Sequence, residues 1–299
     1  MKENIESYVE KIIKEKIKKF TICSRLTWKN IVYYCETETR KYAIKVYKKD
    51  NSAYVRKNVE IAMYKIFSDI KINVPKIYYC GEMDEYYILI SEWIEAMSLK
   101  KLVNNNGVVK NQNIIKNLLE HYKHIWNLNI SNEAKKMLSF NRLEKYSTPS
   151  MIYTRVKVNE EDLFLEFKNI DDIDKIHRIY DKLKKEITPK QYIINSDISL
   201  HEVLIKDKGF FLIDLESFTV GDINNDLAGI FYSLSNSIIN KECEIECLMN
   251  IIRNNEYFLP DIFIFYLIER IFCANYLDTI NKDEIKFYIN FILNKEGMF

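Results

Sequence analysis

The residue types that could carry out chemistry are concentrated in one stretch of the second half of the chain. Asp197 and Glu202 lie in a polar segment before a short apolar run, and Asp214 ends the next apolar run. The turn sequence 206–209 joins the two runs and predicts a β-hairpin, which would bring Glu202 and Asp214 near each other. Three carboxylates around one loop suit a hard cation such as Mg²⁺. Phosphoryl transfer uses one carboxylate to orient the attacking hydroxyl group and others to hold the metal, so we expect that reaction class.

Three short motifs in this region resemble a known family when they are taken in order. Residues 195–202 read NSDISLHE, residues 213–216 read IDLE, and residues 221–228 read GDINNDLA. They resemble the catalytic loop, the metal-binding motif and the motif that follows it in the aminoglycoside phosphotransferase and choline kinase family. The fold of that family is similar to the protein-kinase fold. The resemblance extends over roughly residues 20–235.

The resemblance implies a role for each residue at a matching position. Asp197 would accept or orient the proton of the substrate hydroxyl group, and Asp214 with Glu202 would hold Mg²⁺. Asn195 stands where the family usually has a histidine that braces the catalytic loop, and its amide can also form hydrogen bonds. Asp226 would support the same loop by accepting hydrogen bonds from its backbone N–H groups.

The first part of the chain carries a matching lysine. Residues 42–47 read YAIKVY and resemble the kinase strand whose lysine contacts the nucleotide phosphates. An alternating apolar strand directs Lys45 inward, which is costly unless an anion awaits the ammonium group. Glu60 lies on the next predicted helix and can pair with Lys45. We therefore expect Lys45 and Glu60 in the nucleotide-binding site.

The segment LISEWIE, residues 89–95, resembles the hinge that links the two lobes of such enzymes. The backbone groups of Glu92, Trp93 and Ile94 would meet the purine edge of ATP or GTP. The sequence leaves the choice of nucleotide open. It also leaves open whether the hydroxyl-bearing substrate is an aminoglycoside, choline or another amino alcohol, a sugar, or a substrate of a spore-coat or peptide pathway.

The elements around these residues predict an α+β protein with a two-lobed, protein-kinase-like fold. A small β-rich lobe would span residues 1–95 and a mostly helical lobe residues 96–299. Predicted helices cover 1–19, 53–70, 111–128, 160–170 and 173–187, and further helices follow the strand 210–213. Predicted strands cover 20–23, 31–35, 42–47, 77–80, 86–90, 192–194, 203–205 and 210–213.

Three departures from the family pattern favour an alternative function. Asn195 replaces the usual histidine, Glu202 replaces the usual asparagine ligand of the metal, and the expected phosphate loop, residues 24–30, contains no glycine. A pseudokinase-like binding or scaffold module is therefore the second hypothesis. A protein substrate is disfavoured, because a short segment without an APE motif separates Asp214 from Asp222.

The charge composition limits the kinds of binding partner that are expected. The 44 basic and 43 acidic residues nearly balance, so neither nucleic acid nor an anionic membrane is an expected partner. The chain opens without a signal-peptide pattern, and the apolar segment 259–277 carries charges at helical spacing, which predicts a buried helix rather than a membrane span. We expect a cytoplasmic protein whose six cysteines are reduced and mostly buried. The acids Glu244, Glu246, Glu256, Asp261 and Glu269 could line an acidic substrate pocket or face solvent.

Overall fold

The computed structural model of the chain describes residues 2–26, 30–136, 138, 175, 178–183, 185, 191–207, 209–236, 238, 241–274 and 282–294. These residues form two compact units. The first unit comprises Met1–Met97 together with Glu202–Ser217, and the second comprises Ser98–His201 together with Phe218–Phe299. The hairpin predicted to carry Asp214 therefore belongs to the first unit. The predicted division of the chain into two lobes between residues 95 and 96 stays a prediction.

The first unit is built on a five-stranded antiparallel sheet with the strand order β1-β2-β3-β5-β4. Its strands are β1 (Lys19–Leu26), β2 (Asn30–Glu36), β3 (Lys41–Lys48), β4 (Ile77–Met83) and β5 (Tyr86–Glu92). All five strands were predicted from the sequence, with ends that differ by a few residues. Lys45 lies in the central strand β3, opposite Val32 of β2 and Leu89 of β5.

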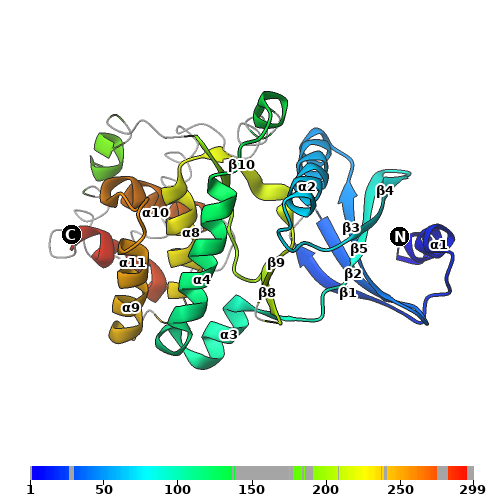
Figure 1. Ribbon diagram of the computed structural model, residues 1–299, viewed down its shortest axis with the longest axis horizontal. Helices are drawn as coiled ribbons and strands as arrows, with labels where there is room; N and C mark the ends of the chain where they lie inside the picture. The colour runs from blue at the N-terminus through cyan, green and yellow to red at the C-terminus, as the bar shows by residue number, and fades with distance from the viewer. Residues whose placement is uncertain are drawn as a thin grey trace. The chain divides into compact units, whose positions relative to one another are not determined.

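One face of this sheet is covered by helix α1 (Lys2–Ile13) (Figure 1). Ile5 and Val9 of α1 are buried in a core cluster that includes Ile44 and Val46 of β3. The predicted helix over residues 1–19 was too long at its C-terminal end. Lys14 has a φ of 57°, a left-handed conformation that cannot continue an α-helix.

The other face of the sheet carries helix α2 (Asn51–Asp69), on the side opposite to α1 in Figure 1. The N-terminus of α2 is capped by Asp50, whose carboxylate accepts a hydrogen bond from the Ala53 N–H at 2.5 Å. Successive strand residues point to opposite faces, so Lys45 and Tyr47 face α2. This alternation directs the lysine toward the buried helix residue Glu60.

A β-hairpin completes the first unit, as the sequence predicted. Strands β8 (Val203–Lys206) and β9 (Gly209–Leu212) pair in antiparallel register, with Val203 opposite Leu212. The 3₁₀-helix η1 (Leu215–Ser217) follows and contacts α2. Asp214 thus lies between the end of the hairpin and a short helix that packs on α2.

The second unit is mostly helical. Its helices are α3 (Leu99–Asn106), α4 (Val108–Trp126), α8 (Ile223–Ser235), α9 (Glu242–Arg253), α10 (Pro260–Ala274) and α11 (Lys282–Leu293). Helix α8 contacts α9 and α10, and α9 also contacts α4 (Figure 1). Strands β7 (Tyr192–Asn195) and β10 (Phe218–Gly221) pair in antiparallel register, and the two-residue strand β6 (Met97–Ser98) lies where the chain passes from the first unit to the second. Strand β10 was not predicted.

The predicted helix 160–170 and most of the predicted helix 173–187 lie outside the described residues, as do positions 27–29 of the expected phosphate loop. The apolar segment predicted as a buried helix corresponds to α10, in which Phe263, Ile264, Leu267 and Ile268 are fully buried. Across the described ranges, no helix is both long enough and apolar enough to cross a bilayer.

The expected burial of the cysteines was wrong for most of those that the structure describes. Cys35 is buried and Cys247 is half-buried, whereas Cys23, Cys80 and Cys243 are exposed. All five are free thiols. Cys35 belongs to the core cluster between α1 and the sheet.

Candidate active site

The central feature of the first unit is the ammonium group of Lys45, which contacts three carboxylates. Its Nζ atom lies 2.9 Å from Glu60 Oε2, 2.5 Å from Asp214 Oδ1 and 2.9 Å from Glu216 Oε2. Only 8% of the Lys45 side chain and 1% of the Glu60 side chain are exposed. The structure therefore brings together Lys45, Glu60 and Asp214, three of the residues singled out from the sequence.

The charges of this cluster shift the pKa values of its members. Burial works against the charged form of Lys45, but the carboxylates of Asp214, Glu216 and Glu60 outweigh it and hold the pKa of Lys45 well above its usual value. Burial raises the pKa of Glu60, although Lys45 opposes that shift. Tyr47 donates a hydrogen bond to Glu60, and its ring centroid lies 5.0 Å from Lys45 Nζ. Lys45 is thus a fixed cation with a defined orientation.

Asp214 adopts an uncommon backbone conformation with a φ of 58°. A non-glycine residue in the left-handed region costs free energy and is concentrated at functional sites. The conformation turns the chain from the hairpin into η1, whose Leu215 is buried. The turn allows the carboxylates of Asp214 and Glu216 to reach the same lysine.

The three carboxylates also offer a site for a divalent cation. Ligand oxygens of Glu60, Asp214 and Glu216 all lie within 4.8 Å of one another. The formal charge of the carboxylates exceeds that of Lys45 and Arg56, the two cations that pair with them, by one unit. An excess of negative charge on hard oxygen ligands fits Mg²⁺.

The membership of this group differs from the ligand set expected from the sequence. Glu216 belongs to it, although in the sequence this residue stands out only as part of the IDLE motif. Glu202 does not belong to it, and its backbone carbonyl accepts a hydrogen bond from the Ile213 N–H at 3.0 Å. The predicted hairpin therefore pairs the backbones of residues 202 and 213. The approach of the Glu202 side chain to Asp214 and its role as a metal ligand stay predictions.

Glu216 is held by two further residues that the sequence analysis did not select. Arg56 Nη1 donates to Glu216 Oε1 at 3.0 Å, and Asn30 Nδ2 donates to Glu216 Oε2 at 2.9 Å. Arg56 is four residues before Glu60 on α2, so the two side chains share one face of the helix. That spacing was the sequence signal that could have identified Arg56.

The expected hinge residues lie at the end of β5 and directly after it. The Glu92 N–H donates to the Lys76 carbonyl at 2.8 Å, and the Trp93 N–H donates to the Lys41 carbonyl at 3.2 Å. These two N–H groups are therefore already used within the first unit. The N–H of Ile94 and the carbonyl groups of the segment are left as candidates for contact with a purine.

The expected catalytic loop lies in the second unit and is braced from two sides. The side chain of the buried Asn195 accepts a hydrogen bond from the Asp197 N–H at 3.3 Å. Arg270 of α10 donates to the Ser196 carbonyl at 3.1 Å. Asn195 therefore bonds to the loop that the family's histidine is expected to brace, and Asp197 is left exposed at the surface of its unit.

Asp226 supports the same loop from α8. Its Oδ2 atom accepts hydrogen bonds from the Asn195 N–H at 3.1 Å and from Trp126 Nε1 at 2.8 Å. Complete burial raises the pKa of Asp226 to about 7, although both hydrogen bonds and Arg270 oppose the shift. Its Oδ1 atom is buried without a hydrogen-bond partner among the described residues. A carboxyl group in this environment gains a proton more readily than an exposed one.

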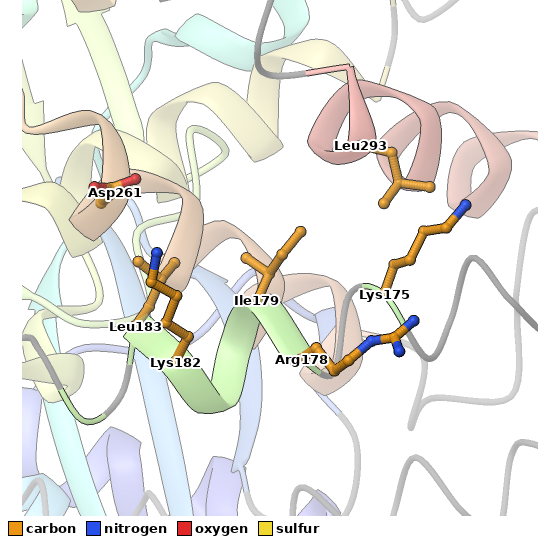
Figure 2. Close-up of a pocket in the computed structure, with 7 residues that line it drawn as sticks. All are labelled: Lys175, Arg178, Ile179, Lys182, Leu183, Asp261 and Leu293. Atoms are coloured by element: carbon orange, nitrogen blue, oxygen red, sulfur yellow. The ribbon is translucent and has the colours of Figure 1, made fainter.

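The second unit also contains a cavity of about 460 Å³, shown in Figure 2. Three basic side chains and one acidic side chain line it, together with apolar residues: Lys175, Arg178, Lys182, Asp261, Ile179, Leu183 and Leu293. The basic side chains outnumber Asp261, so this cavity favours an anionic or neutral ligand over a polycation.

Three of the C-terminal acids considered as the lining of an acidic pocket, Glu244, Glu256 and Glu269, have separate partners. Glu244 accepts a hydrogen bond from the Val109 N–H at 2.8 Å, and Glu256 forms an ion pair with Lys123. Tyr180 donates to Glu269 at 3.2 Å. These contacts connect neighbouring elements and do not gather the acids around one space.

A family model confirms the resemblance seen in the sequence. The model of the phosphotransferase enzyme family matches residues 25–240, which include Lys45, Asp197 and Asp214. The chain belongs to this family. Its members are phosphotransferases, and the protein is therefore an enzyme of that class. A comparison with curated protein sequences gives no match.

Solved structures agree with the family in fold. The chain is similar to spectinomycin phosphotransferase in complex with ADP and spectinomycin, with a TM-score of 0.70, 16% identity and 98% coverage of both chains. It is also similar to the aminoglycoside phosphotransferase APH(4)-Ia, with a TM-score of 0.66, 12% identity and coverage of 98% of this chain and 97% of that one. A third match is the ADP-bound aminoglycoside phosphotransferase APH(2'')-Ib, with a TM-score of 0.57, 15% identity and the same coverage. These likenesses confirm the predicted α+β, kinase-like fold.

The site residues that the family resemblance indicated are divided between the two units. Lys45, Glu60 and Asp214 lie in the first unit of this phosphotransferase, and Asp197 and Asp226 lie in the second. The approach of Asp197 to Asp214, which the sequence predicted, stays a prediction.

Proposed function

We propose that the protein transfers the γ-phosphoryl group of ATP or GTP to a hydroxyl group of a small molecule. The observation that carries this proposal is the buried Lys45 ammonium, held between Glu60 and Asp214. A lysine fixed in this way offers a point charge to the nucleotide phosphates, and its orientation is set before the nucleotide binds. Positioning and electrostatic stabilisation supply most of the rate gain in phosphoryl transfer.

Each site residue of the first unit has a role in this proposal. Lys45 binds the α- and β-phosphates and Glu60 orients it. Asp214 and Glu216 would hold Mg²⁺, with Glu202 as a further candidate ligand. Bound Mg²⁺ would supply the positive charge that neutralises the phosphates during transfer. The segment 92–94 would contact the purine base.

Asp197 provides the remaining function in the second unit. Its carboxylate accepts or orients the proton of the attacking hydroxyl group. Asn195, Asp226 and Arg270 hold the backbone of the loop, because each forms a hydrogen bond with a group of residues 195–197. They are positioning residues.

The substrate class is proposed at the level of a hydroxyl-bearing small molecule. Related structures contain spectinomycin and hygromycin B, which makes aminocyclitols and aminoglycosides reasonable first compounds to test. The basic cavity of the second unit adds neutral and anionic sugars to that set.

A transfer assay with the purified full chain tests the proposal. The chain is incubated with Mg²⁺, ATP or GTP and a panel of these acceptors, and phosphorylated acceptor is detected by mass spectrometry. We expect transfer by the wild type and a loss of turnover of about 10²–10⁴-fold in D197A, with nucleotide affinity nearly unchanged. D181A, which removes an exposed aspartate of the same unit, is the matched control. Full turnover in D197A would contradict the role of Asp197. Nucleotide binding without metal dependence or transfer would instead support the binding module.

A further inference from the structure

Arg56 is a buried cation in which only one of the three guanidinium nitrogens has a hydrogen-bond partner among the described residues. The residue is 7% exposed, and its Nη1 atom donates to Glu216 at 3.0 Å and to Asn30 Oδ1 at 3.4 Å. Its guanidinium carbon lies 5.9 Å from the centroid of the Tyr47 ring. The Nε and Nη2 atoms are also buried, and no described residue accepts a hydrogen bond from either of them.

The two nitrogens without a partner, Nε and Nη2, lie on one edge of the guanidinium group. Nε–H and one Nη2–H are parallel, and this pair matches two oxygens of a phosphate or carboxylate group. Arginine keeps its charge at every physiological pH, so the guanidinium group cannot avoid the need for hydrogen-bond acceptors by losing a proton. A charged donor that is buried without a partner costs free energy, and such a group calls for an explanation. An anion that binds this edge would provide one.

The surroundings of Arg56 identify the kind of anion. Glu216 is already bonded to Arg56 Nη1, Lys45 and Asn30, so it is not the missing partner. Arg56 and Lys45 bind opposite oxygens of the Glu216 carboxylate, which places both cations around one group. Asn30 is the last residue of the segment 24–30, which the sequence places where a glycine-rich phosphate loop is expected. The edge therefore belongs to the part of the first unit expected to receive phosphates.

We propose that Arg56 binds a terminal phosphate group of the nucleotide through Nε and Nη2, while Glu216 holds Nη1. The inference rests on the proposed nucleotide site and adds a second cation to Lys45. A glycine-rich loop contributes closely approaching backbone N–H groups to phosphates, and this chain has no glycine in the corresponding segment. Arg56 supplies two charged donors in their place. The phosphate that binds Arg56 belongs to the donor nucleotide and is not free phosphate, since Lys45 is proposed to bind the α- and β-phosphates of the same nucleotide.

Binding measurements on the full chain test this inference. R56M is compared with K57M, which removes one positive charge from the next position of α2, where Lys57 lies over the rings of Tyr54 and Tyr87. Affinities for Mg-ATP, Mg-ADP, adenosine and inorganic phosphate are measured by calorimetry. We expect R56M to weaken ATP binding by about 10–100-fold, which is the effect of losing charged hydrogen bonds, and to change adenosine binding by less than about twofold. K57M should leave both affinities unchanged, and R56K should lie between R56M and the wild type.

The ratio of ATP to adenosine affinity distinguishes the possible results. An unchanged ratio in R56M overturns the inference, because losing a contact to phosphate must weaken ATP binding more than adenosine binding. Inorganic phosphate that binds the wild type as tightly as ATP, and is lost in R56M, would show a free-phosphate site and also overturn it. A wild type that binds neither ATP nor GTP contradicts the proposed function itself, whereas wild-type binding with an unchanged ratio contradicts only the role of Arg56.

A structure of the wild-type chain with a non-hydrolysable ATP analogue gives an answer that does not depend on the stability of any variant. The inference expects Nε and Nη2 within about 3.2 Å of phosphate oxygens. Bound analogue whose phosphates leave this edge without a partner would overturn it.

Discussion

Lys45 donates a hydrogen bond to Asp214 at 2.5 Å, although the two residues are separated by 169 positions in the chain. The same ammonium contacts Glu60 and Glu216, so one cation is shared by every carboxylate of the candidate metal site. Lys45 and a divalent cation would therefore compete for the same oxygens. We expect nucleotide phosphates to resolve the competition, because they would draw the ammonium group toward their own charge.

Replacement of Lys45 should affect turnover and metal binding in opposite directions. We expect K45M to lower kcat/KM by at least about 100-fold, because the phosphates lose a fixed charge. In the absence of nucleotide, K45M should bind Mn²⁺ more tightly than the wild type, since Arg56 is then the one cation among the described residues that forms an ion pair with these three carboxylates. Steady-state kinetics and metal titration followed by paramagnetic relaxation measure the two effects. K48M, at an exposed position of the same strand, is the control, and weaker metal binding in K45M would contradict the competition.

The ligand set of the metal can be decided by comparing E216Q with E202Q. The structure groups Glu216 with Asp214, whereas the sequence pattern indicated Glu202. We expect E216Q to raise the Mg²⁺ concentration needed for half-maximal activity by about tenfold or more, which corresponds to the loss of one ligand of a charged site. E202Q should raise it less. The opposite order would favour the ligand predicted from the sequence.

Asp226 should make stability depend on pH. Its pKa is about 7 in the folded protein against 3.8 for an unperturbed carboxyl group, so the folded state holds a proton that the unfolded state releases over that range. Stability is therefore highest below the lower value and falls as pH rises toward 7 and above, by a total on the order of 4 kcal/mol.

D226N removes this titration and should flatten the decline, which urea unfolding between pH 5 and pH 8 would measure. D181N, at an exposed position in the same unit, should keep the wild-type slope. A D226N variant that loses stability with pH as steeply as the wild type would show that other groups are responsible.

Gly107 should be sensitive to a single added carbon. It joins α3 and α4 with a φ of 80°, and a Cβ atom there would lie 2.4 Å from Glu244 Oε1. We expect G107A to lower the free energy of unfolding by about 1–2 kcal/mol, because alanine strains the left-handed conformation and the Glu244 carboxylate must move. N106A, at the exposed preceding residue, should have little effect in the same urea titration. Equal stability of G107A and the wild type would contradict this expectation.

The sequence by itself determined the fold class and most of the elements. The alternation of β3 directed Lys45 to one face of a strand, and the turn 206–209 determined the hairpin before Asp214, because strand periodicity and turn chemistry are local properties. The order of three motifs also indicated the family to which the chain belongs. Strand β10 was missed because its four residues carry a weak local signal and pair only with the distant β7.

Only the tertiary structure decided which side chains meet Lys45. Glu216 and Arg56 are ordinary charged residues in the sequence. The spacing of four residues places Arg56 on the helix face of Glu60, but it does not show that either Arg56 or Glu216 is buried. They become part of the site because the positive φ of Asp214 turns η1 toward α2 and because the helix presents Arg56 and Glu60 on one face. The partners of a buried charge are set by long-range packing, which no local pattern encodes.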